Sequence, residues 1–102
     1  MIKHIVMWRL REGVHGLDRA GLALAIKEKL ESLRGRIPGL LKIEVGIDIE
    51  RLDTSADLVL YSEFENRAAL AAYHHHPLHQ AVLPYIAAAR SERRGVDYDV
   101  SA

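Results

Sequence analysis

Cysteine is absent from the 102 residues, so the chain has no disulfide, no thiol nucleophile and no cysteine-based metal site. Neither sign of charge is in excess, because 14 Lys and Arg residues balance 14 Asp and Glu residues, and nothing in this balance favours nucleic acid as a partner. The longest uncharged apolar stretch, residues 81–89, is far shorter than the roughly 20 residues that a bilayer requires. The first residues carry a charge too early for a signal peptide. We therefore expect a soluble, cytoplasmic protein without membrane or nucleic-acid partners.

Apolar residues make up 49% of the sequence, which is typical of a globular chain. No repeat or linker divides it, so we expect a single domain over residues 1–102. A chain of this length buries about two-thirds of the surface that its unfolded form exposes. The core is therefore thin, and a partner subunit would add to it.

Hydrophobic periodicity predicts alternating strands and helices. Residues 2–10 carry apolar side chains at both parities, as in a strand covered on both faces. Apolar steps of three and four then predict a helix that begins after Asp18 and ends by Pro38-Gly39. Residues 41–49 alternate with period two and predict a second strand. The remaining elements expected are a strand over 57–64, a helix over 66–73, a helical segment over 77–90 and a strand over 96–100.

This order, βαββαβ with the second helix split, is that of the ferredoxin-like α+β fold, in which helices cover one face of an antiparallel sheet. Apolar residues lie on both sides of the predicted strands, so the other face would expose more apolar surface than a monomer usually tolerates. A second copy packed sheet against sheet would cover it, and two-fold dimers are the commonest homo-oligomers. We therefore expect a homodimeric α/β barrel. The alternative is a monomer that tolerates the exposed face.

Histidine supplies the candidate chemistry, because four of the six histidines lie within residues 74–79. His76 precedes Pro77 and belongs to the junction between two helices. His79 lies in the first turn of the next helix, where the helix dipole disfavours a charged imidazole. A neutral imidazole can act as a general base at pH 7. His4 is the second candidate, because an ionisable side chain on an apolar strand must find a partner or border a cavity.

Structural roles compete with each of these chemical ones. A buried histidine is often a hydrogen-bonded core residue or a helix cap. His75 and His79 have the spacing of zinc ligands on one helix face, but Pro77 interrupts that helix and no third ligand follows. We therefore expect neither a metal ion nor another cofactor. We interpret Arg90, Glu92, Arg93 and Arg94 as the solvated end of a helix.

Several segments together resemble the stress-responsive α/β-barrel (Dabb) family over nearly the whole chain. They are residues 2–6 (IKHIV), Ile37-Pro38-Gly39, Gly46, residues 56–64, and residues 73–79 with the HPLH element. The resemblance implies a ferredoxin-like protomer in a dimeric α/β barrel. A plant polyketide cyclase similar to this family performs a cofactor-free aldol condensation with two histidines and a tyrosine. Its catalytic positions correspond to His4, Tyr73 and His79.

Three functions remain open at this stage. In the first, a small molecule binds between sheet and helices, His79 is the general base, His4 positions or protonates an oxygen, and Tyr73 donates a hydrogen bond to an enolate. The residues expected to contact that substrate are Trp8, Ile26 and His76. In the second, the histidines form a structural clasp in a stress-related binding dimer without chemistry. The third is a cofactor-free monooxygenase, so whether the protein is an enzyme stays undecided.

Overall fold

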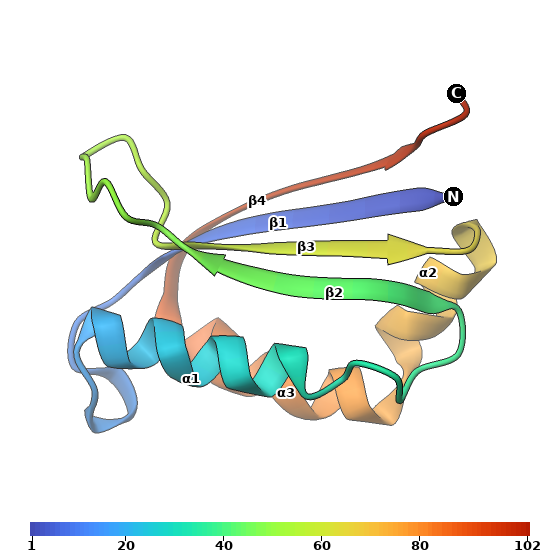
Figure 1. Cartoon of the computed structure of the whole chain (residues 1–102). Helices are drawn as coiled ribbons and strands as arrows, with labels where there is room; N and C mark the ends of the chain where they lie inside the picture. The colour runs from blue at the N-terminus through green and yellow to red at the C-terminus, as the bar shows by residue number, and fades with distance from the viewer.

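The computed structural model describes residues 1–102 as one antiparallel sheet with three helices on one of its faces (Figure 1). This arrangement confirms the predicted ferredoxin-like α+β fold with a split second helix. In chain order, the elements are β1 (Ile2–Leu10), a 3-10 turn (Val14–Gly16), α1 (Arg19–Glu31), β2 (Leu40–Ile47), β3 (Leu58–Phe64), α2 (Arg67–His75), α3 (Pro77–Ala89) and β4 (Arg90–Asp99).

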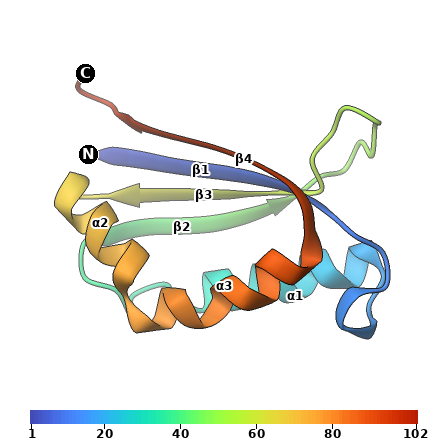
Figure 2. The ribbon, with the colours of Figure 1, turned by 180° about the vertical axis from the view of Figure 1, so that it is seen from behind.

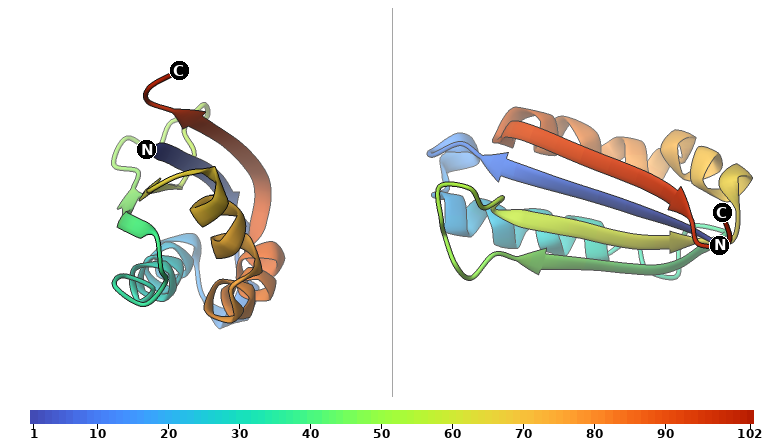
Figure 3. Two further views of the ribbon diagram at one scale, coloured as in Figure 1. Left: turned by 90° about the vertical axis from the view of Figure 1, so that its right-hand side faces the viewer. Right: turned by 90° about the horizontal axis from the view of Figure 1, so that it is seen from above.

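Strand β1 lies inside the sheet, whose order is β2-β3-β1-β4. Both of its neighbours run antiparallel to it, so directly paired residues point to the same face. His4, Val6 and Trp8 are buried on the face that the helices cover, whereas Ile5 and Met7 point the other way. Seen from behind and from above, the helices lie on one side and leave the second face of the sheet bare (Figures 2 and 3).

Helix α1 begins where the sequence predicts, because the Asp18 side chain accepts a hydrogen bond from the Gly21 N–H at 2.8 Å. It ends six residues earlier than expected, at Glu31 instead of near residue 37. Gly35 adopts a left-handed conformation with a φ of 74°, which a helix does not accommodate. Leu33 and Ile37 nevertheless stay buried. The apolar spacing thus predicted their burial correctly but not their secondary structure.

The last strand is the largest departure from the sequence prediction. Strand β4 follows α3 without a loop and begins at Arg90, six residues before the expected start at residue 96. Its first residues pair with Trp8, Arg9 and Leu10 at the end of β1, whose backbone groups need partners. Arg93 and Arg94 are therefore strand residues, and their interpretation as a solvated helix end is wrong.

Strand β2 begins at Leu40 and ends at Ile47 instead of spanning residues 41–49. A bulge between Leu40 and Lys42 shifts the register, so Leu41 is exposed although period two predicted it to share a face with Ile43. The 13-residue helices α1 and α3 are the longest, and no helix combines the length and apolar character needed to cross a membrane.

Gly39 controls how closely the turn after α1 approaches α2. Its φ is 81°, and a Cβ atom there would lie 2.6 Å from Cβ of Ala69. Gly35 has a similar φ, of 74°, but open space around it. We expect Gly39→Ala to lower the free energy of unfolding by about 2–5 kcal/mol through backbone strain and overpacking. The Gly35→Ala control should lose only the strain, about 1–2 kcal/mol. Equal losses in urea denaturation would contradict this account of Gly39.

Candidate functional site

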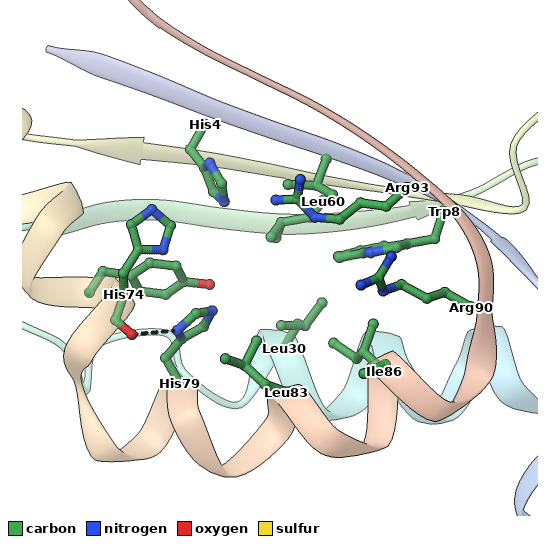
Figure 4. A pocket seen from close by; sticks show the side chains of 13 residues that line it. His4, Trp8, Leu30, Leu60, His74, His79, Leu83, Ile86, Arg90 and Arg93 are labelled. Carbon is green, nitrogen blue, oxygen red and sulfur yellow. Dashed lines mark hydrogen bonds between the residues drawn. The ribbon is translucent and has the colours of Figure 1, made fainter.

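A cavity of about 390 Å³ lies between the inner face of the sheet and helices α1 and α3 (Figure 4). This volume lies within the range of small-molecule binding pockets. Its wall combines ionisable, aromatic and aliphatic side chains from β1, β3, β4 and all three helices. The lining includes His4, Trp8, Leu30, Leu60, Tyr73, His74, His79, Leu83, Ile86, Arg90 and Arg93.

His4 extends from β1 into this cavity and is only 4% exposed. Its Nδ1 is hydrogen-bonded to Oδ1 of Asp97, which the strand register places directly opposite on β4. Because a carboxylate accepts hydrogen bonds, Nδ1 carries the proton and Nε2 is the nitrogen left for a ligand. His4 therefore has the partner that its place on an apolar strand requires, and it also borders the cavity.

Tyr73 of α2 is fully buried, with its ring centroid 4.9 Å from that of Phe64 and 4.1 Å from that of His79. Its hydroxyl group is the one buried side-chain polar group without a hydrogen-bond partner in the protein. Burial raises the pKa of this hydroxyl well above its usual range. The group is therefore a neutral donor at pH 7, and an oxygen atom of a ligand would satisfy it.

His79 lies at the start of α3, and its Nδ1 donates a hydrogen bond of 3.4 Å to the His74 carbonyl oxygen (Figure 4). This bond assigns the proton to Nδ1 and leaves Nε2 as a proton acceptor. Burial lowers the pKa of His79, and the hydrogen bond to His74 opposes this effect only in part. Burial also lowers the pKa of His74, whose ring centroid is 5.5 Å from that of His4 and 5.8 Å from that of His79. Both imidazoles are therefore neutral at pH 7.

Four of the six residues proposed from the sequence border the cavity, namely His4, Trp8, Tyr73 and His79. Ile26 and His76 do not. Ile26 is fully buried in the core, and Nδ1 of His76 accepts a hydrogen bond from the Leu78 N–H and caps α3. Neither residue therefore lines this cavity, although both were expected to contact a substrate.

Among the polar residues that line the cavity, sequence reasoning missed three, namely His74, Arg90 and Arg93. The arginines were missed because their segment was interpreted as the end of a helix. Alternation counted back from Asp97 along a strand would have placed Arg93 on the same face as His4. Among all side chains of the chain, no cluster of three or more His, Asp or Glu residues is positioned to hold a metal ion.

Comparison with known proteins assigns the chain to a family. Residues 2–100 match the Stress responsive A/B Barrel Domain (Dabb) family. The chain belongs to this family. A Dabb domain thus occupies nearly all of it, in agreement with the resemblance inferred from the sequence. The chain is also 35% identical, over 79% of its length, to 81% of the uncharacterized protein SCO4036 of Streptomyces coelicolor.

Solved structures share the fold over the full domain. A dimeric protein of unknown function from Bacteroides fragilis, described as ferredoxin-like, is 34% identical with a TM-score of 0.83, covering 96% of this chain and 94% of that one. An antibiotic biosynthesis monooxygenase is 22% identical with a TM-score of 0.72, covering 98% of both chains. At this identity, the second likeness shows the fold alone.

The lowered pKa values of His74 and His79 predict how stability depends on pH. At pH values between the lowered pKa values of the folded state and the ordinary histidine pKa of 6.5, the unfolded chain binds more protons than the folded chain. We expect the melting temperature to be highest above pH 6.5 and to decrease as the pH falls below it. His79→Gln should reduce this decrease, whereas His75→Gln, at an exposed position, should not. Identical pH profiles for the wild type and His79→Gln would contradict the assignment.

Proposed function

We propose that this Dabb domain binds a small carbonyl compound in the cavity and abstracts a proton from the carbon next to the carbonyl. The arrangement of three groups supports the proposal. Nε2 of His79, the unpartnered hydroxyl of Tyr73 and Nε2 of His4 come from three different elements and border one cavity. They supply a base that takes the proton, a hydrogen-bond donor that stabilises the enolate oxygen, and a second imidazole beside the carbonyl.

The reaction begins when Nε2 of His79 takes the proton from carbon. The electron pair of the broken C–H bond forms the enolate, and its oxygen accepts the hydrogen bond of the Tyr73 hydroxyl. Since the pKa of that hydroxyl is raised, it stays protonated and stabilises the negative charge throughout. His79 then returns its proton to the carbon of the enolate. Alternatively, the enolate carbon forms a C–C bond with a second carbonyl, whose π electrons move to its oxygen, and His79 protonates that oxygen; in both cases the protein ends unchanged.

In its doubly protonated form, whose charge Asp97 balances, His4 donates its Nε2–H hydrogen bond to the carbonyl oxygen or delivers that proton to it. Asp97 holds its imidazole by the Nδ1–H group and so aims Nε2 in a constant direction. In many histidine sites a carboxylate fixes the tautomer and the orientation of the ring in the same way. In this mechanism, Asp97 is a positioning residue and does not touch the substrate.

A binding dimer without chemistry would use the same cavity, and the Tyr73 hydroxyl would donate a hydrogen bond to an oxygen of its ligand in the same way. The hydroxyl therefore supports ligand binding in both functions, and only a measurement of proton exchange separates them. The monooxygenase alternative is supported by the fold alone, because its structural relative is 22% identical.

Exchange of deuterium from the solvent into alkyl phenyl ketones tests the chemistry by NMR. His79→Gln should slow exchange by about 10²–10⁴-fold through loss of the base. Tyr73→Phe should slow it by about 10²-fold, because the donor to the enolate oxygen is removed. The control, His75→Gln, should leave the exchange rate unchanged. If the wild type binds a ketone but exchanges its protons no faster than buffer does, the catalytic proposal is wrong and only the binding function remains.

We also propose that the bare face of the sheet forms a homodimer interface. Its apolar side chains gather over the three neighbouring strands β3, β1 and β4, and three of them are strongly exposed, namely Met7 at 43%, Tyr98 at 44% and Val96 at 54%. Ile5 and Val59 lie beside them. A contiguous apolar patch of this kind is typical of an interface, and the Bacteroides fragilis relative is dimeric.

Sedimentation of charged variants tests this interface. Val96→Asp and Met7→Asp each place a charge within the patch, so we expect them to convert a dimer into a monomer. Leu24→Asp is the matched control, because Leu24 is 55% exposed on helix α1, away from the sheet. A wild-type chain that sediments as a monomer at high dilution would refute the interface.

A further inference from the structure

The cavity is lined by imidazoles and by guanidinium groups. The imidazoles of His4, His74 and His79 gather at one end, and the guanidinium of Arg90 lies at the other, near Trp8 (Figure 4). The Arg93 guanidinium lies between them, because it extends over Gly95 in the direction of Asp97 and His4. Leu30, Leu60 and Leu83 form aliphatic parts of the wall. The reaction proposed above uses only the imidazoles, so the part of the cavity lined by the two arginines, called the cationic end, has no assigned role.

Arg90 is anchored where helix α3 becomes strand β4. It is the C-cap of α3, its backbone is extended, and it pairs with Leu10 of β1. Its carbonyl oxygen accepts a hydrogen bond of 3.2 Å from Nε of Arg11. Its own guanidinium forms neither an ion pair nor a hydrogen bond within the protein, although the residue is half-buried. The backbone of Arg90 is thus held in place, whereas its guanidinium charge has no partner within the protein.

Arg93 is turned toward the cavity by the register of the sheet. It pairs with Trp8, which lies on the inner face, and Gly95 and Asp97 follow on the same face of β4. A Cβ atom at Gly95 would lie 3.1 Å from Nη1 of Arg93. The guanidinium therefore lies over the backbone of Gly95, in the space that a larger side chain would fill. The φ of Gly95 is not positive, so its backbone conformation does not require a glycine. The glycine serves instead to leave this space open for the guanidinium.

No carboxylate of the protein neutralises these two charges in the cavity. Asp97 is hydrogen-bonded to His4, and Glu92 lies opposite Arg9 in the strand register, on the outer face of the sheet. The lining contains neither aspartate nor glutamate. A cation beside an apolar cavity favours a bound anion, and the planar guanidinium suits a carboxylate in particular.

We propose that the cavity takes organic acids, with the carboxylate at Arg90 and Arg93 and the reacting carbonyl at the imidazoles. This inference rests on the proposed function and narrows its substrate class to oxo-acids. The neutral imidazoles of His74 and His79 do not compete for the carboxylate. A carboxylate held by the arginines therefore leaves the carbonyl of the same ligand on the side of the imidazoles.

Matched pairs of a carboxylate and its neutral amide test the cationic end. We use hexanoate, octanoate and decanoate against hexanamide, octanamide and decanamide, with affinity measured by NMR titration. The wild type should prefer the carboxylates, and Arg90→Gln and Arg93→Gln should each weaken their binding by about tenfold while leaving the amides unchanged. Arg94→Gln is the control, because Arg94 pairs with Met7 on the outer face.

Gly95→Val provides a second variant that keeps both charges. Its side chain would occupy the place of the Arg93 guanidinium, so carboxylate binding should weaken as in Arg93→Gln, with amide binding retained. Equal affinity of the wild type for carboxylates and amides would overturn the proposed role of Arg90 and Arg93, and the cavity would remain a candidate binding site. Failure of every probe to bind would overturn the proposed function together with it.

Discussion

The register of strand β1 between β3 and β4 is the constraint on which the site depends. Side chains alternate along the strand, so this pairing turns His4 and Trp8 toward the helices and Ile5 and Met7 toward the bare face. A shift by one residue would exchange the two sets. It would expose the imidazole, bury the apolar patch and separate His4 from Asp97. One set of backbone hydrogen bonds thus defines both the cavity and the proposed interface.

The junction between α2 and α3 contributes the other half of the site. Pro77 begins a new helix directly after α2 ends, which brings the rings of Tyr73 and His79 within 4.1 Å of each other. The same burial that forms the cavity keeps the imidazoles neutral and the hydroxyl protonated. Proteins retain such unfavourable groups where function uses them, at a cost in stability. The arginines without an ion-pair partner in the cavity wall, Arg90 and Arg93, fit the same pattern.

Local patterns predicted most of the fold because burial leaves its period in the sequence. Apolar residues at both parities indicated that residues 2–10 form a strand covered on both faces, and the Pro77 position indicated a new helix with His79 in its first turn. The failures occurred where tertiary contacts override local preference. Arg90 through Gly95 join β4 because the end of β1 needs a partner, and Leu41 is turned outward by a bulge.

The sequence by itself determined the order of elements, the fold class, the family and the histidines that belong near one another. Only the tertiary structure decided which side chains share a cavity. Ile26 lies on the correct face of α1 but inside the core, His76 caps a helix, and Arg93 reaches the cavity across the backbone of Gly95. Periodicity records whether a side chain faces inward. It carries no information on which distant residues meet there, because that depends on how whole elements pack.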